Sequence, residues 1–270
     1  MPTLDRNPSE SITYRYQLIL SLTYSTTDSR NHQTSLLLLV NIFTRSWFLM
    51  ITPPKTIREL SIRADQLAGK TIGELVAQQQ ASAPKDLRAD KGWQGQFIER
   101  CLGADAGNQS KPDFSLIDVE LKTVPIDFLG QVQESTYVAV VDINKLGIQW
   151  RQSVVYHKLK HVLWVPIARD KGENINRSII ATPFLWKPTE QCEAMLRSDW
   201  ENAMELISMG KIHQINAKMG EILQVRPKAA NSRVLTTTTN EQGERAQTLP
   251  RGFYLRSQFT QSLLDHHLKR

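Results

Sequence analysis

Three charged residues, Asp113, Glu120 and Lys122, stand at a spacing that could support metal-dependent chemistry. The pattern of residues 113–124 predicts two short strands that turn near Asp118. Side chains two positions apart on a strand share a face, so Glu120 and Lys122 point the same way. A returning strand would bring Asp113 within reach of Glu120, and the two carboxylates would converge.

Two carboxylates a few ångströms apart raise each other's pKa unless a cation lies between them. Magnesium suits such a pair because it takes few protein oxygens and keeps water and substrate phosphate as its other ligands. We therefore predict metal-dependent phosphodiester cleavage, with Asp113 and Glu120 as metal ligands. Lys122 would orient the attacking water or stabilise transition-state charge. Glu99, just upstream, would hold a metal-bound water or position Lys122; the alternative is an inert, solvated strand face.

The elements that must position these residues form a mixed α/β pattern. Helices are predicted to begin at Thr56 and Thr71, and further helices are predicted over residues 93–102, 189–209 and 257–268. Further strands are predicted at residues 136–141, 163–167, 179–181 and 222–225. His157 and His161 could form a metal pair only if their segment were helical, and the strand-like residues 162–167 argue against it. We expect a central mixed sheet flanked by helices.

Composition limits the class of protein. The chain has 270 residues, 40% hydrophobic and 22% charged, as in ordinary globular proteins. Its net charge of +6 favours a polyanionic partner such as nucleic acid. Cys101 and Cys192 are the only cysteines, so a disulfide scaffold and a zinc site are disfavoured and a reducing cytoplasm is expected. The longest apolar stretch, residues 36–51, is too interrupted to cross a bilayer, so we predict no membrane association.

The first 49 residues differ from the rest, since they are rich in Ser and Thr and show no sustained helical or strand period. One hypothesis is that Met50 is the true start and that residues 1–49 are an upstream extension. The alternative is a genuine, disordered N-terminal tail. Either way, we expect the functional domain to span residues 50–270.

Five segments together resemble the PD-(D/E)xK nuclease superfamily and, within it, the MutH family of mismatch-repair endonucleases, which is related to restriction enzymes that cut GATC. They read RADKGW (88–93), DVELKT (118–123), HKLKHVLW (157–164), VRPKAAN (225–231) and LPRGFYL (249–255). The resemblance runs from about Ile51 to the C-terminus. Several motifs in the family's order are far more specific than the triplet alone.

The resemblance implies that Asp113 and Glu120 bind the metal and that Lys122 is catalytic. It also implies that Glu99 and Lys158 complete the active site. The DNA-reading face, including the part that senses adenine methylation, would comprise Lys91, Tyr137, Arg226, Pro227, Lys228 and Tyr254. Arginine can pair with a guanine edge in the major groove, which agrees with this assignment.

Alternatives and departures accompany this face. Arg226 and Lys228 could simply be a phosphate-binding strand end, and Tyr254 taken alone could be a core residue. The chain departs from the family pattern at Asp118, where the family often has Gly, and at Tyr137, where Phe is expected.

At the level of the whole protein, the resemblance implies a restriction-endonuclease-like fold in two lobes with a DNA-binding cleft between them. The catalytic lobe would centre on about residues 85–170, and the DNA-reading part on about 190–270. A cytoplasmic, Mg²⁺-dependent monomer would nick the unmethylated strand of hemimethylated GATC sites, 5′ to the G. Activation would come from MutL in concert with MutS. The rivals are a GATC restriction endonuclease that cuts both strands and a non-catalytic DNA-binding regulator.

Overall fold

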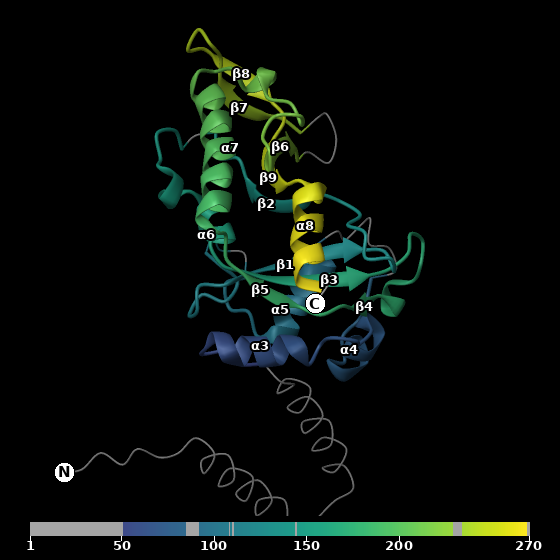
Figure 1. Ribbon diagram of the computed structural model, residues 1–270. Helices are drawn as coiled ribbons and strands as arrows, with labels where there is room; N and C mark the ends of the chain where they lie inside the picture. The colour runs from purple at the N-terminus through teal and green to yellow at the C-terminus, as the bar shows by residue number, and fades with distance from the viewer. Residues whose placement is uncertain are drawn as a thin grey trace, which may run out of the picture. The chain divides into compact units, whose positions relative to one another are not determined.

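A computed structural model describes residues 51–84, 92–107, 109, 111–143, 145–228 and 234–268. Residues 51–270 cluster into one unit (Figure 1). The predicted extension over residues 1–49, with its alternative start at Met50, lies outside the described residues, and so does Lys91. Of the helices described, none combines the length and the apolar character needed to cross a membrane.

A mixed sheet lies at the centre of this unit. Strand β1 (Glu120–Ile126) pairs in parallel with β3 (Val162–Ala168), and β3 also pairs antiparallel with β4 (Ile179–Ile180) and β5 (Phe184–Trp186). Every residue of β3 is buried. Its side chains alternate between two separate hydrophobic cores, because successive residues of a strand face opposite sides of the sheet.

One core lies beneath helices α3 (Ile57–Asp65), α4 (Ile72–Gln78) and α5 (Trp93–Leu102). Both predicted helix starts are confirmed. The Thr56 hydroxyl accepts a hydrogen bond from the Glu59 amide at 3.1 Å, and Thr71 forms a full capping box with Glu74. These caps satisfy amides that have no partner inside the helix, so they fix where each helix begins.

The other core is enclosed by helices α6 (Val154–Leu159), α7 (Glu190–Ser208) and α8 (Ser257–Leu268) together with a second sheet. That sheet is antiparallel, in the order β2 (Thr136–Val140), β9 (Arg251–Leu255) and β6 (Leu223–Pro227). Strands β7 (Thr236–Thr239) and β8 (Arg245–Thr248) form a separate hairpin, seen beyond β6 in Figure 1. Three short 3₁₀ helices occupy Trp150–Gln152, Ile175–Arg177 and Ile212–Gln214.

The observed elements correct several sequence predictions. The described residues form three sheets, so the central mixed sheet is smaller than predicted and two antiparallel sheets accompany it. The first strand predicted in residues 113–124 is reduced to a single bridge between Phe114 and Val119. Helix α6 was not expected, because six residues are too few for a clear helical period. The argument that the histidine segment is not helical was therefore wrong for His157, although α6 ends before His161.

A buried carboxylate joins α7 to β6. Asp199, which is 8% exposed, accepts hydrogen bonds of 2.9–3.0 Å from the backbone amides of Glu221, Ile222 and Leu223. Gly220 precedes these amides with a φ of +83°, and a Cβ there would lie 1.9 Å from the Leu223 carbonyl oxygen. The turn into β6 thus depends on one acceptor and one glycine.

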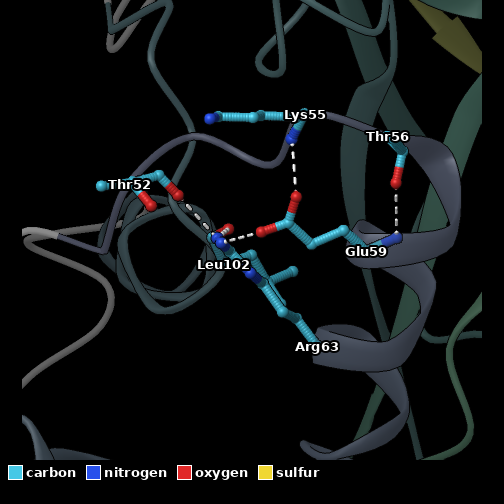
Figure 2. A network of polar contacts seen from close by, with 6 residues as sticks. All are labelled: Thr52, Lys55, Thr56, Glu59, Arg63 and Leu102. Atoms are coloured by element: carbon cyan, nitrogen blue, oxygen red, sulfur yellow. Dashed lines mark hydrogen bonds and ion pairs between the residues drawn. The ribbon is translucent and has the colours of Figure 1, made fainter. Parts of the chain in front are cut away.

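An arginine ties the start of the described chain to α5 (Figure 2). The guanidinium of Arg63 donates to the carbonyl oxygens of Thr52, at 2.7 Å, and Leu102, at 3.0 Å. Its other terminal nitrogen lies 2.5 Å from Oε1 of Glu59, and Oε2 of Glu59 accepts a hydrogen bond from the Lys55 amide. Since α5 carries Glu99, this network stabilises one wall of the site described below.

We expect Arg63→Ala to lower the free energy of unfolding by about 1–3 kcal/mol, because the Leu102 carbonyl at the end of α5 loses its side-chain donor. Arg63→Lys should recover little of this, since an ammonium cannot reproduce the fork of donors. Arg58→Ala, at an exposed position of the same helix, is the control and should change stability by less than about 0.5 kcal/mol. Urea denaturation measures all three; equal losses for Arg58→Ala and Arg63→Ala would contradict the expectation.

Candidate active site

A cleft of about 820 Å³ runs between α5, β1, α6 and the second sheet. Five of the predicted site residues line it: Glu99, Asp113, Glu120, Lys122 and Lys158. Tyr137 and Lys228 line it as well. The residues predicted for catalysis and two of those predicted for DNA reading therefore share one cavity.

Strand β1 positions Glu120 and Lys122 as the alternation of side chains predicted. The Lys122 ammonium lies 2.5 Å from Oε1 of Glu120. Glu120 is only 1% exposed, so the alternative of a solvated strand face is wrong. Asp113 is also buried, and its Oδ2 accepts a 2.8 Å hydrogen bond from the Leu121 amide. This bond anchors the Asp113 carboxylate directly to β1.

Lys158 reaches the same carboxylate from α6, 38 positions along the chain. Its ammonium lies 2.8 Å from Oε1 of Glu120, the oxygen that Lys122 also contacts. Helix α6 begins where the Ser153 hydroxyl accepts from the Tyr156 amide at 3.0 Å, and this start places Lys158 in the last turn. Two cations therefore converge on one oxygen of Glu120.

The electrostatics of the cleft favour a further cation near the acids. Burial, followed by the charge of Glu120, raises the pKa of Asp113 to about 6. Burial, followed by the charges of Asp113 and Glu120, raises the pKa of Glu99 to about 7. Burial alone would lower the pKa of Lys158, but attraction and hydrogen bonding to Glu120 outweigh it and the net pKa is raised. The acids repel one another despite both lysines.

The donor set fits a magnesium ion. Oε2 of Glu120 is buried and has no hydrogen-bond partner among the described residues, which is a costly state for a carboxylate oxygen. No cluster of three or more His, Cys, Asp or Glu side chains suited to a metal was found in the described part of the chain. Magnesium needs no such cluster, because it binds through one or two carboxylates and fills its octahedron with water and phosphate.

The raised carboxyl pKa values predict how the metal-free protein responds to pH. The folded protein holds protons on Asp113 up to about pH 6 and on Glu99 up to about pH 7, whereas the unfolded chain releases them near 3.8 and 4.5. The folded state thus binds more protons across this window, so these two groups make stability fall as pH rises through it. With a chelator present, we therefore expect the melting temperature of Glu99→Gln minus that of the wild type to increase by a few degrees as the pH rises from 4.5 to 7.

Thermal melting at several pH values with EDTA makes this comparison. Groups elsewhere titrate equally in both proteins, so only the difference between their melting temperatures is informative. A difference that stays constant across the window would contradict the raised pKa of Glu99.

The structure also gathers four of the six residues predicted to read DNA. The rings of Tyr137 and Tyr254 meet edge to face, with centroids 5.4 Å apart. The Lys228 ammonium lies 3.6 Å from the centroid of the Tyr137 ring, and the Arg226 guanidinium lies 5.7 Å from that of Tyr254. Tyr254 is only half-buried, so the alternative of a core residue does not describe it. We call these four residues the aromatic–cation cluster.

The structure assigns no side-chain contact with this cluster to Pro227, which lies between Arg226 and Lys228 in the chain. Pro227 is exposed at the end of β6, and Lys91 lies outside the described residues. Several cleft residues had no role in the sequence analysis, and one of them is Arg251, whose guanidinium donates to the Ile215 carbonyl oxygen at 3.2 Å. Arg251 lies inside the LPRGFYL segment, so the signal was present in the sequence but indicated no particular role.

Comparisons with known proteins agree with this geometry. Residues 102–199 match the family model described as the DNA mismatch repair enzyme MutH. The chain is 47% identical over 219 residues to the DNA mismatch repair protein MutH of Salmonella paratyphi C (strain RKS4594), which covers 81% of this chain and 95% of that protein. The MutH protein of Salmonella choleraesuis (strain SC-B67) gives the same values, and that of Salmonella paratyphi B (strain ATCC BAA-1250 / SPB7) is 46% identical with the same coverage.

The family model covers most of the catalytic side of the cleft, including Asp113, Glu120, Lys122 and Lys158. The relatives extend the match to nearly their whole length at almost one identical residue in two. The chain therefore belongs to the MutH family of DNA mismatch repair enzymes.

Proposed function

We propose that this protein is the Mg²⁺-dependent endonuclease of methyl-directed mismatch repair, which nicks the unmethylated strand of hemimethylated GATC sites 5′ to the G. One observation carries the chemistry. One oxygen of Glu120 is held by Lys122 and Lys158, while the other is buried without a hydrogen-bond partner among the described residues, in a cleft that Asp113 also lines. Such a carboxylate is better suited to binding a hard cation than to serving only as a partner in a structural ion pair.

Each residue then has a distinct task. Asp113 and Glu120 hold Mg²⁺, and the Leu121 amide keeps Asp113 aimed at the cleft. When bound, Mg²⁺ supplies electrostatic stabilisation of the phosphoryl transition state and lowers the pKa of water. Lys122 orients the attacking water, and Lys158 stabilises negative charge on the phosphate oxygens. Glu99, which lines the same cleft, would hold a metal-bound water or position Lys122.

DNA would lie across the cleft, with the aromatic–cation cluster against its bases. Arg226, Pro227, Lys228, Tyr137 and Tyr254 would form the reading surface, and Lys91 would add a further contact. Arg226 projects from an exposed strand end and can pair with a guanine edge. The restriction-endonuclease-like arrangement in two lobes belongs to the same proposal, with a catalytic lobe at about residues 85–170 and a DNA-reading part at about 190–270.

We further propose that the enzyme works as a cytoplasmic monomer activated by MutL, with MutS acting upstream. One active site of this kind, in the described part of the chain, suits an enzyme that cuts one strand. The endonuclease would occupy residues 50–270, with residues 1–49 as an extension or a mis-assigned start. The clustering of residues 51–270 into one unit supports this boundary.

Strand-resolved cleavage tests the proposal. Unmethylated, hemimethylated and fully methylated GATC duplexes are incubated with the protein and Mg²⁺, with and without MutL. We expect nicks only in unmethylated strands, 5′ to the G, and faster nicking with MutL. Unaided cutting of both strands would identify a restriction endonuclease instead. Binding without cleavage at any magnesium concentration would identify a non-catalytic regulator.

A further inference from the structure

Gly252 of β9 lies where two aromatic rings meet. A Cβ added at Gly252 would lie 3.1 Å from Cε2 of Tyr137, 3.1 Å from Cε2 of Tyr254 and 3.3 Å from the Ala139 carbonyl oxygen. Most side chains do not approach their neighbours this closely. The φ of Gly252 is not in the left-handed region, so the backbone itself does not require glycine. The surrounding side chains do require glycine, because a methyl group at residue 252 would contact both rings too closely.

The two rings come from opposing strands. Tyr137 of β2 is paired directly with Tyr254 of β9, and the register between these strands shifts between Tyr137 and Ala139. Beyond the shift, Gly252 is paired with Val140. The bulge and the missing side chain occur together, so the rings can close over the β9 backbone to their edge-to-face separation of 5.4 Å.

The two cationic residues predicted to read DNA, Arg226 and Lys228, each lie over one of these rings. On the other side of β9, Arg226 of β6 is the partner of Gly252, and its guanidinium lies over the Tyr254 ring while donating to the Ser135 hydroxyl at 2.6 Å. Lys228 lies over the Tyr137 ring. The two rings are therefore among the contacts that hold both cations in place.

We propose that Gly252 is a positioning residue for DNA recognition, which sets the separation of Tyr137 and Tyr254 and through them the positions of Arg226 and Lys228. The inference rests on the proposed function and adds to it a determinant that touches no base. A side chain at residue 252 would push the rings outward by a few tenths of an ångström. Paired hydrogen bonds to a base edge tolerate such shifts poorly, so selectivity should suffer more than binding to phosphates.

The test compares wild type with Gly252→Ala on a hemimethylated GATC duplex and on duplexes with one base pair of the site replaced. We expect the ratio of kcat/KM for GATC over the altered sites to fall roughly tenfold, within the range that one good base contact contributes. Gly172→Ala is the control: its φ of +91° adds backbone strain that Gly252→Ala does not have, but its Cβ would have no atom within 4 Å, so it shows whether strain remote from the rings affects the ratio. The control should keep the wild-type ratio.

A second comparison tests the route through the rings. In a Tyr137→Ala background one of the two obstacles is gone, so Gly252→Ala should reduce the ratio clearly less than it does in the wild type. Equal reductions in both backgrounds would overturn the proposed route. An unchanged ratio in Gly252→Ala would overturn the inference, and so would a variant that does not fold, because the role would then be structural.

The outcomes also separate this inference from the proposed function. A wild type that does not cut GATC in preference to the altered sites removes the proposed function itself. A selective wild type beside an equally selective Gly252→Ala removes only the positioning role.

Discussion

Asp113→Asn is expected to reduce nicking of hemimethylated GATC DNA by roughly a thousandfold or more, while binding to the duplex survives. Metal coordination contributes several kcal/mol to transition-state stabilisation, and each 1.36 kcal/mol corresponds to about a tenfold change in rate. Asparagine keeps an oxygen that can accept from the Leu121 amide, so the segment from Asp113 to Leu121 should remain folded. The loss would then report the missing negative charge and not a collapsed site.

Asp118→Asn is the matched control. Asp118 lies five positions after Asp113 in the chain. Its φ is +58°, a value that asparagine also tolerates. Its side chain is 55% exposed and pairs with Lys160. Asp118 does not line the cleft that holds Asp113 and Glu120. Single-turnover nicking and fluorescence anisotropy on the same duplex provide both readouts. Nicking by Asp113→Asn at the rate of Asp118→Asn would refute the assignment of the metal site.

The largest expected effect on stability is at Asp199, which lies far from Asp113 and Glu120 in the sequence. Asp199→Ala removes the acceptor shared by the amides of Glu221, Ile222 and Leu223. A buried donor left without a partner costs about 1–3 kcal/mol. We therefore expect the free energy of unfolding to fall by about 3 kcal/mol or more. Asp199→Asn keeps one acceptor oxygen and should lose less.

Urea denaturation with an unchanged slope is the measurement. Glu201→Ala, on the same helix, is the control, since Glu201 forms only an exposed pair with Arg197 and should contribute less than about 1 kcal/mol. Equal stability of Asp199→Ala and Glu201→Ala would show that the turn into β6 does not depend on this carboxylate. Strand β6 carries Arg226, so weaker DNA binding should accompany the loss of stability.

Local interactions explain which elements the sequence predicts well. The starts of α3 and α4 follow from Thr56 and Thr71, whose caps involve partners only three residues away. The bounds of α8 agree with the prediction over residues 257–268. In contrast, the short α6 depends on packing of Val155 and Leu159 against residues distant in the chain, and its six residues carry too little local signal.

For the candidate site, residue types and spacing alone show which groups are available and which of them share a face. The period of two along β1 places Glu120 beside Lys122, because that contact needs only one strand. Motif order further indicated the family. These are properties of residue identity and spacing over short stretches, which require no knowledge of the remaining chain.

Tertiary structure decided everything that depends on distant segments meeting. The parallel pairing of Glu120 with Val162 brings the end of α6 next to the start of β1, and only then does Lys158 reach the Glu120 carboxylate. Burial, which raises the pKa of Asp113 and leaves a Glu120 oxygen without a partner, likewise exists only in the packed chain. The close packing of the Tyr137 and Tyr254 rings at Gly252 depends on the pairing of strands β2, β9 and β6. Spacing along the sequence cannot encode such distances, because they arise from how whole elements pack.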